Sequence, residues 1–161
     1  VKAALDARTD PDFVIIARSD ADEISLDDLI ERCNLYWEAG ADIIMPIVWM
    51  INGKPWTDLP IEEVIEAHRR VRNEVSGLLL GLALPAELTT SDIADLGYKI
   101  YIYPWEALQA ASAAVYELMG ELSMTGTTKG YFDRHPPLDY QLNSEMLRTL
   151  EWLELNGRYA S

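Results

Sequence analysis

Three polar side chains, Arg18, Ser19 and Asp20, directly follow an apolar run that begins at Phe13. A continuous apolar run is typical of a strand buried on both faces, and polar groups at its carboxyl end lie where α/β proteins bind ligands. The arginine guanidinium is permanently charged and offers parallel N–H donors that match a carboxylate or a phosphate. We therefore expect Arg18 to bind an anion, although an ion pair with Asp20 or a neighbouring acid would also explain a charge at this position.

Acidic and aromatic side chains follow at the same end of the predicted sheet. Asp20, Asp22 and Glu23 form a cluster that could bind a cation, but three acids in one loop are usually solvated, which is the interpretation we favour. Trp49 and Trp56 flank a loop after the second predicted strand, a position from which barrel loops reach a ligand. These tryptophans either cover a pocket or pack between subunits.

The two histidines and the single cysteine are weaker candidates for chemistry. His68 is on a helix rich in charge, which predicts a solvated surface position, and His135 is expected in an exposed loop before two prolines. Cys33 lies near the apolar stripe of a helix without cationic neighbours, so we expect an inert, partly buried thiol. One cysteine also excludes an internal disulfide and a cysteine-based metal cluster.

Strands and helices alternate along the first three quarters of the chain, which indicates a parallel sheet with right-handed crossovers. Ser25 and Gly40 bound the first helix, Pro60 begins the second, and Ser91 or Thr90 is expected to cap the third. The predicted strands are residues 13–17, 42–48, 77–83 and 99–103. The predicted helices are residues 25–40, 60–72, 90–97, 104–119 and 144–156.

The predicted fold class is α/β, and strands buried on both faces fit either a doubly wound sheet or part of a barrel. We divide the chain into residues 1–122, which form four strand-and-helix units, and residues 123–161, a tail with a loop and a docking helix. Residues 1–8 resemble the end of a helix already under way, so the chain is expected to be cut from a longer one. A half-barrel would leave two unpaired edges, which its missing half, a second copy or an open-sheet rearrangement would satisfy.

Composition argues against two classes of partner. The chain contains 27 acidic and 13 basic residues, and its net charge of −14 repels nucleic acid and anionic lipid. Its longest apolar stretches are shorter than the roughly 18 to 20 residues of a bilayer span, and no charged-then-apolar leader opens the chain. We therefore expect a cytoplasmic protein that binds neither nucleic acid nor membrane.

Two segments resemble the isocitrate lyase and phosphoenolpyruvate mutase superfamily, and its methylisocitrate-lyase-like members in particular. The first is Ala17-Arg18-Ser19-Asp20-Ala21, which is similar to the family's Ala-Arg-Thr-Asp-Ala segment, and the second runs from Trp37 to Pro46. Further segments are placed as in that family: Leu88-Thr89-Thr90, Tyr101-Ile102-Tyr103-Pro104 and Gly126-Thr127-Thr128. The resemblance covers essentially the whole chain but only the carboxyl-terminal half of the family's β/α barrel.

The resemblance implies a Mg²⁺-dependent enzyme that makes or breaks C–C or P–C bonds next to a carboxylate through an enolate-type intermediate. It implies that Arg18 is a catalytic residue in contact with the substrate carboxylate or the enolate oxygen, and that Ser19, Asp20 and Gln109 help to bind the substrate. It also implies a homo-oligomer, with a late helix exchanged between subunits.

The chain departs from the family pattern at several positions. The aspartates that hold Mg²⁺ and the Lys-Cys-Gly-His loop belong to the family's amino-terminal half, so we assign no metal ligand in this chain. Ile47 occupies the place of a family glutamate, and Gln109 that of an arginine found in methylisocitrate lyases. The favoured function is part of a lyase or mutase acting on small oxo- or hydroxy-carboxylates. The alternatives are a non-catalytic remnant or oligomerisation module of the same fold, or a decarboxylase of oxaloacetate-type acids.

Overall fold

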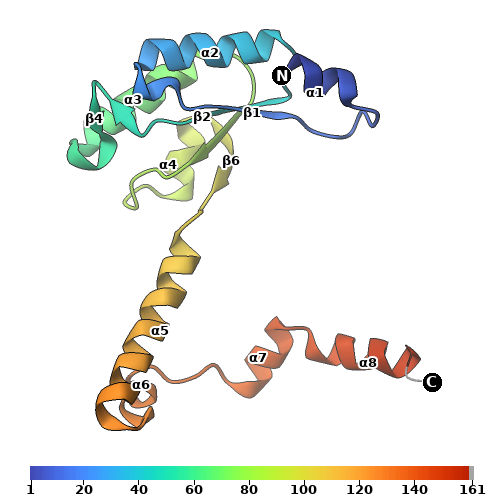
Figure 1. Cartoon of the computed structure of the whole chain (residues 1–161), viewed down its shortest axis with the longest axis vertical. Helices are drawn as coiled ribbons and strands as arrows, with labels where there is room; N and C mark the ends of the chain where they lie inside the picture. The colour runs from blue at the N-terminus through green and yellow to red at the C-terminus, as the bar shows by residue number, and fades with distance from the viewer. Residues whose placement is uncertain (160–161) are drawn as a thin grey trace. The chain divides into compact units, whose positions relative to one another are not determined.

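A four-stranded parallel sheet organises the first part of the chain in the computed structural model (Figure 1). Its strands follow the order β1-β2-β5-β6, and every neighbouring pair is parallel. The bounds are Ile16–Ser19 for β1, Ile43–Pro46 for β2, Leu79–Leu82 for β5 and Tyr98–Ile102 for β6. These strands confirm the predicted α/β class with a parallel sheet.

The structure describes residues 1–159, which divide into two compact units with a boundary between Glu106 and Ala107. Each unit is described by itself below. The predicted division after residue 122 falls within helix α5 (Glu106–Thr125) and stays a prediction.

Strand β1 begins three residues later than predicted. The Phe13 amide donates to the Asp10 carbonyl in a turn, and the Ile15 amide donates to Asp42 Oδ2 at 2.8 Å, so ladder pairing starts only at Ile16. The prediction of burial on both faces is wrong for this strand, because Phe13 is 64% exposed and Ile16 is also exposed. Arg18 consequently lies inside β1, directly opposite Met45 of β2.

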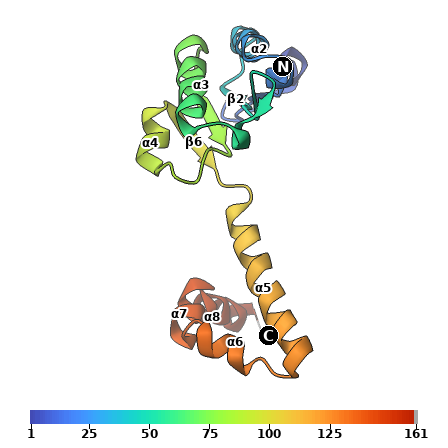
Figure 2. The same cartoon turned by 90° about the vertical axis from the view of Figure 1, so that its left-hand side faces the viewer.

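Three helices cover one face of this sheet, and Figure 2 shows them in succession along the same side. They are α2 (Leu26–Glu38), α3 (Ile61–Glu74) and α4 (Thr90–Asp95). Their apolar residues form one core with the strands, which includes Leu29, Cys33, Ile44, Val64, Val71, Leu79, Ile93 and Tyr98. The opposite face keeps exposed apolar side chains, among them Ile16, Ile100 and Ile102. Packing on one face only explains why the strands are less buried than their sequences suggest.

Capping side chains set the ends of the helices. The Ser25 hydroxyl accepts a hydrogen bond from the Asp28 amide at 3.0 Å, which confirms Ser25 as the cap of α2. Thr89, not Thr90 or Ser91, caps α4. Its hydroxyl accepts from the Asp92 amide while Asp92 accepts from the Thr89 amide at 2.8 Å, and this reciprocal capping box explains the earlier start.

His68 corrects another expectation, since its side chain is buried and only 4% exposed. It lies on the same helical face as Val64 and Val71, which point into the core. Its Nδ1 shares a hydrogen bond of 2.6 Å with the Tyr98 hydroxyl, and the two rings meet edge to face. Burial lowers the pKa of His68 to about 4, so the imidazole is neutral near pH 7.

Short elements complete the first unit. They are α1 (Lys2–Ala7), the 3-10 helices η1 (Ala21–Glu23) and η2 (Trp56–Asp58), and the antiparallel pair β3 (Met50–Ile51) and β4 (Lys54–Pro55). The helix α1 confirms the predicted helical start. The sequence predicted only a loop between Trp49 and Trp56, where the structure forms this β3–β4 hairpin.

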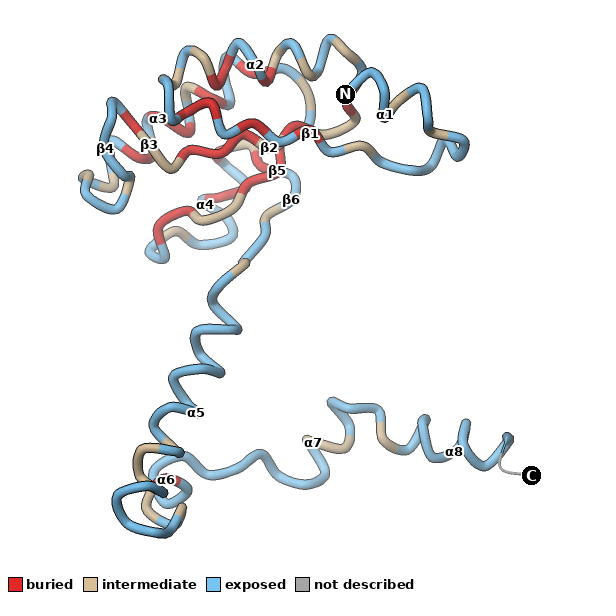
Figure 3. Tube along the Cα trace, in the orientation of Figure 1, coloured by how far each residue is buried: buried red, intermediate tan, exposed pale blue. Residues whose placement is uncertain are grey.

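The second unit consists of helices α5, α6 (Lys129–Arg134), α7 (Tyr140–Met146) and α8 (Thr149–Tyr159). Sequence analysis missed α6. It also predicted one final helix where the structure has two, because Arg148, between α7 and α8, adopts a φ of 52° and ends the helical path. Most residues of α5 to α8 are exposed (Figure 3). Among residues 1–159, no helix is both long and apolar enough to cross a membrane.

The buried imidazole of His68 predicts a pH dependence of stability. Its pKa is about 4 in the folded chain and 6.5 when unfolded, so below pH 6.5 the unfolded chain binds a proton that the folded chain does not. Stability is complete above pH 6.5 and falls as the pH drops towards 4. We expect a loss of about 1.5 kcal/mol between pH 6.5 and about 5, measured by urea unfolding.

Two variants isolate this effect. His68→Gln removes the titrating group, so the loss between pH 6.5 and about 5 should disappear, whereas His135→Gln removes the exposed histidine and should keep it. Equal slopes in both variants would show that other groups titrate in this range.

Cys33 is completely buried, and burial raises the pKa of its thiol to about 12. Because only the thiolate reacts readily, we expect negligible reaction with a coloured disulfide reagent at pH 8 in the native state and reaction of one thiol per chain in urea. Rapid labelling of the native chain would contradict this assignment of Cys33 to the core.

Candidate functional site

Arg18 lies near the carboxyl end of β1 with its guanidinium at the surface, 52% exposed. Its Nε donates to Asp20 Oδ2 at 2.9 Å and its Nη2 donates to Asp20 Oδ1 at 2.6 Å. This two-point ion pair raises the pKa of Arg18 above its ordinary value. The structure therefore brings two predicted site residues together, and any anion that binds Arg18 would replace or share the Asp20 carboxylate.

Ser19 contacts the backbone of neighbouring segments in this site. Its side chain is buried on the helix-covered side of the sheet, where its hydroxyl is 3.4 Å from the Ala21 amide. Its carbonyl accepts a hydrogen bond from the Ile47 amide at 3.0 Å. Ser19 thus links the end of β1 to the residue that follows β2, and its predicted contact with a substrate stays a prediction.

Asp22 is not solvated, contrary to expectation, because its side chain is only 3% exposed. Its Oδ2 accepts hydrogen bonds from the Trp49 amide at 2.7 Å and the Met50 amide at 2.8 Å. The 3-10 helix η1 turns this carboxylate inward, towards the segment that follows β2. Sequence analysis missed the role, because nothing in the local pattern pairs Asp22 with amides 27 and 28 residues away.

An open pocket of about 350 Å³ surrounds the Arg18 side chain. Two arginines and two acids contribute charge to it, and Tyr36 of α2 contributes a hydroxyl group. The lining residues are Arg18, Ser19, Asp20, Ala21, Glu23, Ile24, Arg32 and Tyr36. Guanidinium and phenol donors in an accessible hollow can hold a small carboxylate.

Two other predicted positions are not among the residues that line this pocket. Gln109 is exposed on helix α5, in the second unit, and its part in substrate binding stays a prediction. Ile47, which occupies the place of a family glutamate, is buried with 2% of its surface exposed. Its aliphatic side chain can neither accept a proton nor hold a metal-bound water.

The described residues contain no cluster of three or more metal-binding side chains. Nowhere in residues 1–159 do three His, Cys, Asp or Glu side chains come close enough to hold a metal ion. Of the acids after β1, Asp20 is paired with Arg18, and Asp22 faces backbone amides. Two of the three acids in this cluster therefore have internal partners, although Asp22 Oδ1 is buried without a hydrogen-bond partner among residues 1–159.

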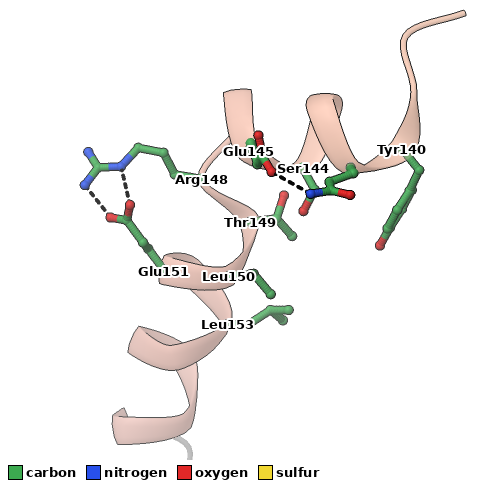
Figure 4. A pocket seen from close by; sticks show the side chains of 9 residues that line it. Tyr140, Ser144, Glu145, Arg148, Thr149, Leu150, Glu151 and Leu153 are labelled. Carbon is green, nitrogen blue, oxygen red and sulfur yellow. Dashed lines mark hydrogen bonds and ion pairs between the residues drawn. The ribbon is translucent and has the colours of Figure 1, made fainter.

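A larger pocket of about 600 Å³ lies within the second unit, between α7 and α8 (Figure 4). Gln141 Nε2 donates to Glu145 Oε1 at 3.0 Å, and Arg148 pairs with Glu151. Leu150 and much of the remaining wall are apolar. Its charged side chains already have hydrogen-bond partners, and the described residues that line it include no histidine or lysine that could activate a hydroxyl group, so we do not assign acid–base or nucleophilic chemistry to this pocket.

Comparison with known proteins gives consistent results. The family model described as phosphoenolpyruvate phosphomutase matches residues 1–123. The chain is 33% identical to 2,3-dimethylmalate lyase of Eubacterium barkeri over 138 residues, which covers 83% of this chain and 43% of that protein. It is 31% identical to 2-methylisocitrate lyase of Escherichia coli, with 83% and 42% covered.

Comparison with solved structures also finds members of this superfamily. A phosphonopyruvate hydrolase, whose crystal structure was determined in complex with oxalate and Mg²⁺, matches with a TM-score of 0.73 at 27% identity. The match covers 99% of this chain and 54% of that one, so this chain spans about half the length of the relatives it matches. The family match over 123 residues and the relatives of 31% and 33% identity show that the chain belongs to the phosphoenolpyruvate phosphomutase family, within the isocitrate lyase and phosphoenolpyruvate mutase superfamily, and its parallel sheet agrees with this.

Proposed function

We propose that this chain forms the carboxyl-terminal half of a β/α barrel enzyme that cleaves or forms a C–C or P–C bond in a small oxo- or hydroxy-carboxylate. The observation that supports this most is the exposed guanidinium of Arg18 at the carboxyl edge of a parallel sheet, inside the segment that the family model matches. In α/β proteins this edge is where ligands bind.

Arg18 binds the anionic group of the substrate in this proposal. Its guanidinium already holds the Asp20 carboxylate at two points, so a substrate carboxylate of the same shape can take over those donors. As the bond breaks, negative charge accumulates on the substrate oxygens, and a fixed, permanently charged donor stabilises that charge. The pairing with Asp20 keeps the guanidinium in place before the substrate arrives.

The acid, the base and the metal ligands come from outside this chain in the proposal. Ile47 cannot transfer a proton, and His68 is buried against Tyr98 on the helix side of the sheet. The phosphonopyruvate hydrolase was crystallised with Mg²⁺ and oxalate, whereas the described residues of this chain form no metal cluster. We therefore assign Mg²⁺ to side chains that face Arg18 from the other half of the barrel.

Substitution of Arg18 tests the function. In the protein as its gene encodes it, Arg18→Ala should lower kcat/KM about a hundredfold or more, the scale of one lost charge-stabilising donor. The assay uses 2-methylisocitrate, 2,3-dimethylmalate, phosphonopyruvate and oxaloacetate in turn, with Mg²⁺ present.

Arg69→Ala is the matched control, because Arg69 is an exposed arginine of α3 whose ion pair with Glu66 is long, at 3.8 Å. It should leave kcat/KM within about twofold of the unchanged protein. Unchanged kinetics in Arg18→Ala would remove Arg18 from the reaction, and no turnover of any of the four acids would overturn the proposed function.

Products from oxaloacetate distinguish the lyase proposal from a decarboxylase. Decarboxylation releases carbon dioxide and pyruvate, whereas hydrolytic C–C cleavage releases oxalate and acetate. An oxaloacetate acetylhydrolase is among the structures that share this fold, with a TM-score of 0.66 at 22% identity. The same Arg18 site would serve either outcome.

We also propose that the second unit mediates assembly of a homo-oligomer, with exchange of a late helix between subunits as one arrangement. Apolar side chains are exposed on both of its longer helices, including Leu108, Val115 and Met119 on α5 and Leu150 and Leu153 on α8. Exposed apolar stripes of this kind are typical of protein interfaces.

Light scattering tests the assembly. The unchanged protein should have a mass of at least two chains, and Val115→Glu with Met119→Glu should lower that mass because a buried charge opposes association. A folded monomer before substitution would overturn this part of the proposal.

A further inference from the structure

We propose that Asp22 is a positioning residue that ties the segment after β1 to the start of the β3–β4 hairpin after β2, and so shapes the anion site at Arg18. This inference rests on the proposed function of Arg18. Asp22 lies two residues after Asp20, in the 3-10 helix η1 that follows β1, and the hairpin follows β2. Asp22 therefore joins the segments that leave two neighbouring parallel strands at their carboxyl ends.

The contacts of Asp22 are those of a buried anchor. Both the Trp49 amide and the Met50 amide donate to its Oδ2, at 2.7 and 2.8 Å. Burial of a carboxylate is costly, and charge-assisted bonds from two amides to Oδ2 offset part of that cost, whereas Oδ1 is buried without a hydrogen-bond partner among the described residues. A third bond, from the Ile47 amide to the Ser19 carbonyl at 3.0 Å, attaches the same segment to the end of β1.

The β3–β4 hairpin, which begins at the residues that Asp22 binds, is held together by several contacts of its own. Its two tip residues, Asn52 and Gly53, have φ values of 52° and 76°, the positive pair that a tight two-residue turn needs. The Trp56 amide donates to the Trp49 carbonyl at 2.9 Å and closes the base. Ile51 is buried in the core of the first unit. Asp22 holds the base of the hairpin at Trp49 and Met50, and the buried Ile51 holds its middle.

Asp22 and Asp20 then have different parts at the site. Asp20 is exposed and can release Arg18 to a ligand, whereas Asp22 is held in the interior by two amides. Both carboxylates act on the guanidinium and raise the pKa of Arg18, with Asp20 the stronger. Asp22 lies two residues after Asp20 in the segment that follows β1, so a shift of that segment would move Asp20 relative to Arg18.

Three substitutions of Asp22 distinguish the effect of its hydrogen bonds to the hairpin from the effect of its negative charge. Asp22→Asn keeps an oxygen that can accept both amides but removes the charge, Asp22→Glu keeps the charge but moves the carboxylate by one methylene, and Asp22→Ala removes both. The positioning role predicts that Asp22→Asn binds oxalate within about threefold of the unchanged protein. It predicts that Asp22→Ala and Asp22→Glu bind oxalate about tenfold or more weakly, the scale of about 1.4 kcal/mol.

The probe is oxalate with Mg²⁺, titrated by calorimetry into the protein as its gene encodes it, and hydrogen exchange of the Trp49 and Met50 amides is the second readout. Exchange should accelerate at least tenfold in Asp22→Ala and little in Asp22→Asn. If Asp22→Ala does not fold, Asp22→Glu decides the question.

Asp42→Ala is the matched control, because Asp42 also accepts a backbone amide, that of Ile15 at 2.8 Å, but at the amino end of the strands. It should lower stability and leave oxalate affinity unchanged. Failure of the unchanged protein to bind oxalate would overturn the proposed function and this inference with it. Oxalate binding that is equally tight in Asp22→Ala, or equally weak in Asp22→Asn and Asp22→Ala, would overturn this inference alone.

Discussion

The parallel pairing of β1 with β2 determines where every candidate group of the first unit lies. It places Arg18 opposite Met45 and Ser19 opposite Pro46, so the polar segment after β1 and the hairpin after β2 leave the sheet at the same edge. A shift of one residue in this register would turn Arg18 towards the helices and Ser19 towards the open face. The Asp42 carboxylate fixes the register at the other end, because it accepts the Ile15 amide and pairs with Arg8 at 2.8 Å.

Local patterns were enough to predict much of this architecture. Alternation of strands and helices predicted the α/β class, and Ser25 and Gly40 marked the ends of α2. The segment around Arg18, together with residues 37–46, indicated the family. These features depend on residues that are close in sequence, such as a hydroxyl and an amide three positions apart. The same logic failed at Thr89 only because its partner, Asp92, was not recognised.

Contacts between distant segments could not be predicted in the same way. His68 sits among charged neighbours in sequence, yet its helix turns it onto Tyr98, which is 30 residues later. Asp22 belongs to an acidic run, yet its partners are amides beyond β2. In both cases the packing of the folded chain outweighs the polarity of the sequence neighbours. The break at Arg148 likewise depends on one backbone angle that the residues of α7 and α8 do not indicate.

The uncovered side of the sheet affects how the chain behaves in solution. In the described residues taken alone, its outer strands, β1 and β6, expose Ile16, Ile100 and Ile102 beside unpaired backbone groups, an arrangement that recruits further strands into aggregates unless the other half of the proposed barrel covers it. A net charge of −14 opposes such growth at low ionic strength, and dissolved salt screens that repulsion beyond about 10 Å at 0.1 M. The net charge therefore opposes association at these two edges, and this repulsion is weakest in concentrated buffers.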